Sequence, residues 1–510
     1  MAASDNRIKD ILIVGGGTAG WMTAALLNRF LPPGKCRITL VESADIGVIG
    51  VGEATVPPLV SFLRSLGIDE DEFMVATHAS YKLGIKFVNW RKGNDVLWHP
   101  FGPIGGTIDY TQIFHYWLKD KRERGDSSTY YDYSLQTLLS EMNKAPRSLQ
   151  QSTKIIEMGG YAYHFDAKEF AGFLARLCAK RGVQHVIDNV RGVELDERGF
   201  IRHVETEKHG PLTADLFIDC TGFAGLLIDK TLKDPFVGWS DFLLCDRAWA
   251  SSLDYDAKLP PYTQSTALKA GWEWRIPLSH RVGSGYVFSS RFISDEAAAQ
   301  EFLAHNKLDP AKVEPKLLRM RIGHRTNFWI RNCVAVGLTS GFIEPLESTG
   351  IYLIQKGASL LLDLFPDKGF DETLIRHYNR KMLAAYEEVR DFIILHYVLT
   401  EREDTDFWKA NRRTVLPDSL AATLELYEQS GVVNWEKESL FGETSFLAIA
   451  AGFGRLPKRH LPRAEYSNES KVREVLATIK SGNRQLAHTL PDHGDFIREL
   501  NATRKAPVQA

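Results

Sequence analysis

The sequence predicts an α/β protein with a parallel sheet, an additional β region and a mainly helical C-terminal region. Three observations lead to this fold class. An apolar run at residues 10–14 ends in a glycine-rich turn, and a helical pattern and a second apolar run at residues 37–41 follow it. Apolar runs at residues 216–219 and 334–336 also end in glycine-rich turns. Beyond about residue 370 the pattern becomes mainly helical and richly charged.

The composition is that of a globular protein and excludes several classes of function. Of 510 residues, 44% are hydrophobic and 25% are charged, and the net charge is −2. This balance gives no support to binding of nucleic acid or an anionic membrane. The five cysteines are scattered without metal-ligand spacing, so we expect no metal site and a reduced, cytoplasmic location. No signal-peptide layout and no apolar stretch of the ~20 residues that span a bilayer is found.

The first glycine-rich turn has the spacing of a dinucleotide fingerprint, Gly15-x-Gly17-x-x-Gly20, between a strand and a helix. In this motif, Gly15 permits a tight turn and Gly17 lets the backbone approach a pyrophosphate. Gly20 allows the helix to pack closely on the strand. The alternative is a turn with only a structural role.

The start of the following helix and the end of the second strand complete the predicted site. Thr18 and Ala19 lie at the helix N-terminus, where free N–H groups favour phosphate. Glu42 lies 22 residues after Gly20 and can accept hydrogen bonds from an adenosine ribose. A chain with its own NADPH domain would normally carry a second fingerprint, and none follows a good strand. We therefore predict FAD as the cofactor and a separate NAD(P)H-dependent flavin reductase as a partner.

The remaining pattern divides the chain into two regions. We expect a helix over 167–181 and strands within 184–206. Both belong to a predicted region 1–370, in which inserted strands on the substrate side span about 80–300. A helical region, 371–510, is expected to cover the substrate.

Four segments resemble flavin-dependent tryptophan halogenases. They are Gly-Val-Gly-Glu-Ala-Thr-Val-Pro at 50–57, Ser80–Phe87, Gly-Trp-Glu-Trp-Arg-Ile-Pro at 271–277, and Pro345–Ile351. The resemblance implies an FAD-binding, Rossmann-like sheet of the flavin monooxygenase type. It also implies that FADH2, oxygen and chloride or bromide yield hypohalous acid, which halogenates an electron-rich arene such as an indole. A homodimer would be typical of the family.

Lys82 matches the essential lysine of the family. A lysine can donate a hydrogen bond to hypohalous acid or, when neutral, form a haloamine. The haloamine requires a lowered pKa, which burial provides. Without the resemblance, Lys82 reads as a surface or sheet-edge lysine that the sequence does not separate from Lys86.

Glu347 matches the catalytic glutamate. A carboxylate near the reacting carbon can stabilise a cationic intermediate and accept the proton that restores aromaticity. The alternative is an acid at a helix start, with Ser348 or Thr349 as the cap.

Residues in this segment, in the glycine-rich turn before it and in segment 50–57 are expected to contact the halide and the flavin. The N–H groups of Thr349 and Gly350 form the expected halide cradle. Leu338, Ala54 and Ile351 are expected to contact the flavin cofactor.

Trp272 and Trp274 should share one face of a strand. The resemblance gives them the role of walling the space between flavin and substrate. A pair of core aromatic residues is the alternative.

Residues 98–102 resemble the family's His-Pro-Phe segment, which makes His99 and Phe101 candidates to sandwich an indole. The alternative is a loop histidine beside a core phenylalanine. Tryptophan halogenases hold the amino-acid end of tryptophan with two tyrosines, and the best local match, residues 444–447, has Ser445-Phe446 instead. This difference favours indole, or another arene without the charged end, over free tryptophan.

Two other functions share parts of this pattern. A flavin-dependent aromatic hydroxylase needs neither Lys82 nor the tryptophan pair, and a non-catalytic flavin-binding protein tolerates loss of both Lys82 and Glu347. The joint presence of these residues favours the halogenase.

Overall fold

The computed structural model describes residues 5–46, 52–149, 160–255, 258–436 and 438–504. Gly50 and Val51 of the segment 50–57 lie outside the described residues. None of the described helices is long and apolar enough to cross a membrane.

The first sheet has six strands in the order β10-β2-β1-β14-β23-β22. The first five strands run parallel and β22 pairs antiparallel at the edge. Their bounds are β1 Asp10–Val14, β2 Arg37–Glu42, β10 Gln184–Ile187, β14 Leu216–Asp219, β22 Trp329–Ile330 and β23 Cys333–Ala335. The predicted parallel sheet is confirmed, and its strands β1 and β14 have the predicted bounds.

Helices pack against this sheet at the points where the sequence predicts them. They are α1 Thr18–Phe30, α6 Ala167–Lys180 and α8 Gly350–Asp363. The helix predicted over 167–181 is one residue shorter. Four of the five residues of β1 are buried, and α1 lies against both α6 and α8. The glycine-rich turns after β1 and β23 therefore come together at the N-terminal ends of α1 and α8.

The additional β region is a seven-stranded sheet, ordered β20-β16-β19-β18-β17-β5-β6. All neighbours pair antiparallel except β17 and β5. The strands are β5 Gly84–Val88, β6 Val96–Pro100, β16 Arg247–Leu253, β17 Thr263–Ala267, β18 Gly271–Pro277, β19 Val282–Phe288 and β20 Lys316–Arg319. A small sheet of β3 Glu53–Ala54, β9 Ala162–Phe165 and β4 Ser80–Lys82 carries the segment with Lys82.

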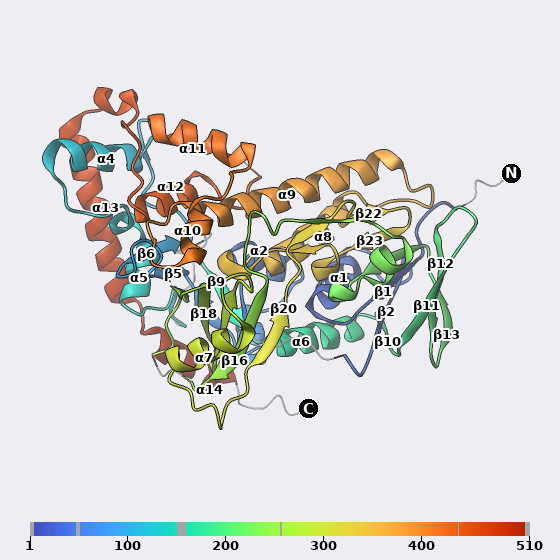
Figure 1. Cartoon of the computed structure of the whole chain (residues 1–510). Helices are drawn as coiled ribbons and strands as arrows, with labels where there is room; N and C mark the ends of the chain where they lie inside the picture. Colours follow the sequence, from blue (N-terminus) through green and yellow to red (C-terminus); the bar gives the residue numbers. More distant parts are fainter. Residues whose placement is uncertain (1–4, 47–51, 150–159, 256–257, 437, 505–510) are drawn as a thin grey trace.

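Other elements extend these sheets. Strands β11 Val190–Leu195, β12 Ile201–Thr206 and β13 Gly210–Thr213 form the projecting sheet at the right of Figure 1. The remaining bounds before residue 372 are α2 Pro58–Ser65, α3 Glu70–Ala76, β7 Thr107–Ile108, β8 Thr111–Gln112, α4 Ile113–Arg124, α5 Leu135–Glu141, β15 Phe236–Gly238, α7 Asp295–His305, β21 Gly323–Arg325 and β24 Gly341–Phe342.

The C-terminal region is helical, as predicted. It comprises α9 Glu372–Val398, α10 Asp406–Arg412, α11 Asp418–Ser430, α12 Glu443–Gly452, α13 Glu469–Thr489 and α14 His493–Arg504. Much of it lies beside the seven-stranded sheet, and α9 also runs beside α8 (Figure 1). One hydrophobic cluster includes residues from both predicted regions, among them Ile11 and Ile393. The division at residue 370 stays a prediction.

Candidate active site

The glycine fingerprint has the geometry that a dinucleotide needs. Gly15 has a φ of +110°, a conformation that favours glycine. A Cβ atom on Gly20 would lie 1.9 Å from the Gly15 carbonyl oxygen, so only glycine lets α1 pack this closely. A Cβ atom on Gly17 would meet nothing within 4 Å, which leaves open space at the helix start.

The helix start and the acid fit the adenosine half of FAD. Gly17 is the N-cap of α1 and no side chain caps the helix, so the N–H groups of its first turn, beginning at Thr18 and Ala19, are available to phosphate. Glu42 Oε2 lies against Gly16, where it would be 1.7 Å from a Cβ atom. Glu42 Oε1 lies 2.7 Å from His185 Nε2 on β10, a partner that the sequence analysis missed.

The residues expected at the flavin lie on three separate segments. Leu338 is half-buried in the turn after β23, and Ala54 and Ile351 are buried in β3 and α8. A Cβ atom on Gly337 would lie 2.6 Å from the Ala19 Cβ, so this turn closes directly on the start of α1. The contacts of Leu338, Ala54 and Ile351 with the cofactor stay predictions.

Lys82 is fully buried on β4. Its side chain is 0% exposed, and Nζ donates to the Thr55 carbonyl at 3.0 Å and to Ser348 Oγ at 2.8 Å. Nζ also lies 5.0 Å from the centre of the Phe101 ring. Burial lowers the pKa of Lys82 from 10.5 to about 7. A surface position is therefore wrong, whereas the sheet-edge position holds, since β4 is an edge strand of its small sheet.

Lys86 has a different environment. It is half-buried, and Nζ lies 5.6 Å from the ring centres of both Trp98 and Tyr262. The structure thus separates two lysines that the sequence leaves equivalent, because only Lys82 reaches the segment that carries Glu347.

The start of α8 differs from the predicted cap. Ser348 has a left-handed φ of +60°, and the N-cap Thr349 has φ −90° and ψ −7° rather than an extended conformation. Thr349 takes the N-cap position, as one of the two predicted caps, but neither hydroxyl makes a capping hydrogen bond. The Ser348 hydroxyl instead accepts from Lys82. Space is open beside Gly350, where a Cβ atom would meet nothing within 4 Å. This uncapped end fits the halide cradle predicted at Thr349 and Gly350, which stays a prediction.

Glu347 is fully buried between two histidines. Oε2 lies 2.7 Å from His99 Nδ1, and Oε1 lies 2.9 Å from His396 Nε2 on α9. Burial by itself raises the pKa of this carboxyl, but the two rings outweigh it and hold the pKa at about 2. Glu347 is therefore an ionised carboxylate in the protein interior and not a solvated acid at a helix end.

The two tryptophans share one face of β18, as predicted. Their ring centres are 6.3 Å apart, and both side chains are buried. Their proposed role as a wall between flavin and substrate stays a prediction.

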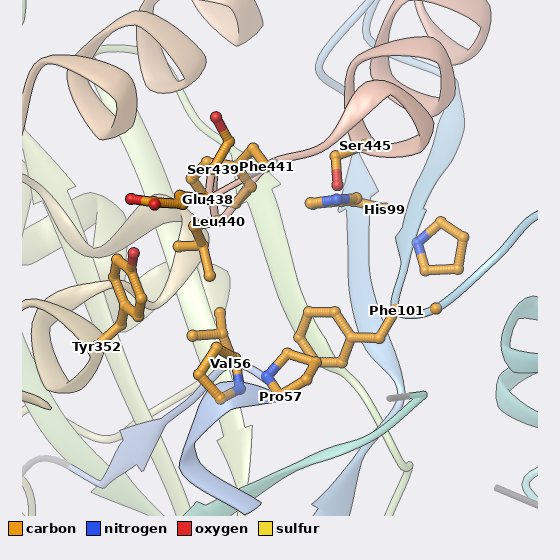
Figure 2. Close-up of a pocket in the computed structure, with 13 residues that line it drawn as sticks. Val56, Pro57, His99, Phe101, Tyr352, Glu438, Ser439, Leu440, Phe441 and Ser445 are labelled. Carbon is orange, nitrogen blue, oxygen red and sulfur yellow. The ribbon is translucent and has the colours of Figure 1, made fainter. Parts of the chain in front are cut away.

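A cavity of about 300 Å³ lies beside this centre (Figure 2). His99 and Phe101 both line it, which fits their predicted role. Their ring centres are 6.4 Å apart and their planes are 76° apart. Two parallel rings around a third need about 7 Å at ordinary contact distances, so an indole sandwich requires one ring to turn. The lining is Val56, Pro57, Pro58, His99, Pro100, Phe101, Gly102, Tyr352, Glu438, Ser439, Leu440, Phe441 and Ser445.

The comparisons with known proteins agree with this geometry. The model of the tryptophan halogenase family matches residues 10–469. The chain belongs to the tryptophan halogenase family.

The halogenase resembles relatives and solved structures along almost its whole length. It is 39% identical to the tryptophan 6-halogenase ThaL of Streptomyces albogriseolus, covering 98% of this chain and 99% of ThaL. It is 37% identical to the tryptophan 7-halogenase RebH of Lentzea aerocolonigenes, covering 97% and 99%. The structure of BrvH, a flavin-dependent halogenase from Brevundimonas sp. BAL3, matches with a TM-score of 0.91 at 39% identity, covering 98% of this chain and 100% of BrvH.

The chain is therefore a flavin-dependent halogenase, an enzyme that uses FADH2 and a halide. Such enzymes need a separate flavin reductase and an aromatic substrate. The hydroxylase and the non-catalytic flavin-binding protein are the less supported alternatives.

The sequence analysis missed several cavity residues of the halogenase. Tyr352 follows Ile351 on α8, and Leu440 and Phe441 lie in the connection before α12. Phe441 stacks on Phe392 of α9 at 4.0 Å. No local pattern marks these residues, because helix and loop positions reach the cavity only through tertiary packing. Ser445 does line the cavity, which fits the match of its segment to the tyrosine pair, and the match stays a prediction.

Proposed function

We propose that this halogenase acts on indole, or on a similar electron-rich arene without a carboxylate, bound in the cavity beside His99 and Phe101. One observation carries the proposal: among the described residues that line the cavity, none is lysine or arginine, and the one carboxylate is Glu438. A substrate carboxylate would have no cationic partner among these residues, and Glu438 already pairs with Lys381 Nζ at 2.9 Å. Leaving such a group unpaired is costly.

Lys82 is proposed to meet the oxidant. As an ammonium it donates to the oxygen of hypohalous acid, and as a neutral amine it can accept the halogen to form a haloamine. A pKa of about 7 keeps both forms populated near neutral pH, so both routes stay open. The bonds to Thr55 and Ser348 fix the position of the nitrogen.

Glu347 is proposed to supply the negative charge that stabilises the cationic ring intermediate and drives loss of its proton. An ionised carboxylate in a buried site acts strongly because little water screens it. Lys82 and Glu347 come together through Ser348, which follows Glu347 in the chain and accepts from Lys82 Nζ.

Residues at the start of α1 would hold FAD: Gly15, Gly17 and Gly20 at the pyrophosphate and Glu42 at the ribose. When bound as FADH2, the flavin supplies with oxygen the oxidising power that converts a halide to hypohalous acid. Trp272 and Trp274 are proposed to separate the flavin from the arene. A homodimer and a cytoplasmic location are further proposals from the sequence, which sizing of the purified protein and cell fractionation test.

Competition between substrates tests the proposed substrate class. The enzyme is incubated with a flavin reductase, FAD, NADH, each halide, and equal amounts of indole, tryptamine, tryptophan and indole-3-acetate. Halogenated products are read by their isotope pattern in a mass spectrum. We expect indole to react preferentially and indole-3-acetate to react least.

The Glu438→Gln variant is the matched control, because it removes the one carboxylate of the lining and keeps its shape. It should narrow the gap between indole and indole-3-acetate. Preferential halogenation of tryptophan by the wild type would contradict the proposed substrate class.

A further inference from the structure

The strand that carries Lys82 is held along its outer edge by groups that do not belong to a strand. Among the described strands, β4 has β9 as its only hydrogen-bonded neighbour. In an antiparallel ladder, alternate residues turn their N–H groups away from the partner strand. The N–H group of Tyr81 donates to His493 Nε2 at 3.1 Å. The N–H group of Leu83 donates to the Pro261 carbonyl at 2.8 Å. An imidazole and a loop thus bind the backbone on both sides of Lys82.

His493 is the first residue of α14, the last helix of the chain (Figure 1), and backbone groups occupy both nitrogens of its ring. Nδ1 lies 2.6 Å from the Leu259 carbonyl, which can only accept, so Nδ1 carries the hydrogen. Nε2 is then the acceptor that the Tyr81 N–H group requires. His493 is 0% exposed, and burial lowers its pKa to about 4, which keeps the ring in this neutral form. Neither nitrogen is left to exchange a proton with a substrate, so His493 is not a catalytic residue.

The loop that His493 reaches is held in a strained conformation. Leu259 has a left-handed φ of +45° and is 0% exposed. A bulky residue keeps such a conformation only where the surrounding contacts fix it. His493 fixes the Leu259 carbonyl, and Asn143 Nδ2 donates to the neighbouring Lys258 carbonyl at 2.7 Å. The Asn143 carbonyl in turn accepts from the His493 N–H group at 2.8 Å. The start of α14 and the loop that ends at Pro261 therefore form one assembly at the edge of β4.

The position of the Lys82 nitrogen depends on this edge. Nζ donates to the Thr55 carbonyl and to Ser348 Oγ, and both bonds require the backbone of β4 to stay in place. A buried N–H group that loses its acceptor costs free energy, which the strand recovers only by moving or by admitting water. A displacement of about 1 Å can cost an enzyme about 10²-fold in rate. Loss of the His493 acceptor should therefore be felt at the Lys82 nitrogen.

We propose that His493 is a positioning residue for halogenation: it pairs with the outer edge of β4 in place of a strand and so fixes the Lys82 amine where the oxidant arrives. This inference rests on the proposed function, which assigns the oxidant to Lys82. It gives the C-terminal helix a part in the reaction. Helix α14 is anchored beside β4, because Phe496 is buried with its ring centre 5.7 Å from that of Tyr81.

Two substitutions at His493 separate hydrogen bonding from packing. His493→Leu fills much of the same space but can neither accept nor donate, whereas His493→Gln keeps one acceptor and one donor. Halogenation of indole is measured with a flavin reductase, FAD, NADH and each halide. Catalase removes peroxide made by free flavin. Taurine is present as an amine that captures hypohalous acid outside the enzyme, so the halogenated taurine reports the oxidant that escapes.

We expect the loss to appear in kcat and in the fate of the oxidant. In His493→Leu, kcat should fall by about 10-fold to 10²-fold, and the share of halogenated taurine should rise because a displaced amine holds the oxidant less well. The KM for indole should stay near the wild-type value, since no described residue of β4 or α14 lines the cavity. His493→Gln should restore most of the kcat and most of the wild-type product ratio.

His115→Leu is the matched control. His115 is also buried, its Nδ1 also accepts from a backbone N–H group, that of Leu461 at 3.3 Å, and burial also lowers its pKa to about 4. It lies on α4, outside the small sheet that carries Lys82. His115→Leu therefore removes the same kind of contact and should leave the product ratio unchanged. FAD fluorescence and circular dichroism establish that each variant is folded and binds the cofactor.

Asn143→Gly is a milder second variant, for the case that His493→Leu does not fold. Asn143 has a left-handed φ of +54°, which glycine adopts readily, so the backbone is not strained by the change. The substitution removes the amide that donates to the Lys258 carbonyl and to Asp492 Oδ2. It should lower kcat and raise the share of halogenated taurine in the same direction as His493→Leu, by a smaller amount.

Three results would overturn the inference. They are a wild-type kcat and product ratio in His493→Leu (or in Asn143→Gly, if His493→Leu does not fold), equal losses in His493→Leu and His493→Gln, and an equal rise of halogenated taurine in His115→Leu. Failure of the proposed function looks different. Lys82→Ala with wild-type turnover would remove the lysine itself from the mechanism. A wild type that halogenates only tryptophan overturns the proposed substrate, and the same variants are then compared with tryptophan.

Discussion

The cofactor side and the substrate side of this halogenase are built in different ways. Around the start of α1 the backbone determines the site: Gly20 packs on the Gly15 carbonyl, and Gly17 leaves open space. Around the cavity, side chains determine it: Lys82 comes from β4, His99 from β6 and His396 from α9. The first kind of site depends on which positions lack a Cβ atom. The second depends on the position and charge of single atoms, so removing one functional group there should stop the chemistry while FAD still binds.

The largest expected effect is on Lys82. Lys82→Ala should abolish halogenation, because the nitrogen that meets hypohalous acid is removed, while FAD binding stays at the wild-type level. Product formation by mass spectrometry and FAD binding by fluorescence measure the two effects separately. Lys86→Ala is the matched control, since Lys86 contacts Trp98 and Tyr262 and not Ser348. It should retain activity, and wild-type turnover by Lys82→Ala would remove this lysine from the mechanism.

A smaller loss is expected for Glu347. Glu347→Gln keeps the shape but removes the charge that stabilises the cationic ring intermediate, so kcat should fall about 10²-fold. Steady-state kinetics at saturating halide measure it. Glu344→Gln is the control on the same segment: burial raises the pKa of Glu344 to about 7, and its Oε1 accepts from the Tyr397 hydroxyl at 2.6 Å. A neutral amide there changes the charge less, and an equal loss in both variants would contradict a special role for Glu347.

This contrast also explains what the sequence can predict. The fingerprint is local, because residues 10–42 form a strand, a turn, a helix and a second strand in order, and the structure places β1 at the predicted residues. Lys82 and Lys86 differ in burial and in their partners, and both depend on strands and loops far away in the sequence. His396 lies within the 27-residue helix α9, whose pattern does not mark it as a partner of Glu347. The order of the seven-stranded sheet likewise depends on the pairing of β5 with β17, which no local signal predicts.

On the cofactor side, Gly20→Ala should reduce both stability and FAD affinity. The added Cβ atom would lie 1.9 Å from a backbone oxygen, which cannot rotate away as a side chain does. We expect a cost near the upper end of the roughly 1–3 kcal/mol typical of overpacking, measured by urea unfolding with and without FAD. Gly17→Ala is the matched control, since its Cβ atom meets no protein atom. It should leave the apoprotein as stable as the wild type and weaken only FAD binding. Equal destabilisation of the two apoproteins would contradict the packing argument.

The smallest expected effect is a gain in stability on the substrate side. The unfolded Lys82 amine binds a proton below about pH 10.5, and the folded amine binds it only below about pH 7. Unfolding therefore takes up a proton between these values, and the wild-type free energy of unfolding loses this contribution as the pH falls from 10.5 to 7. The shift corresponds to about 5 kcal/mol, and somewhat more than half is offset because Lys82→Met leaves the Thr55 carbonyl and Ser348 hydroxyl without a donor. Lys82→Met should thus be about 2 kcal/mol more stable than the wild type near pH 7, and the difference should shrink toward pH 10, as read from urea midpoints across this range. A difference that does not change with pH would mean that folding does not lower the pKa of Lys82. The substrate side would then lack the loss of stability that we attribute to its catalytic lysine.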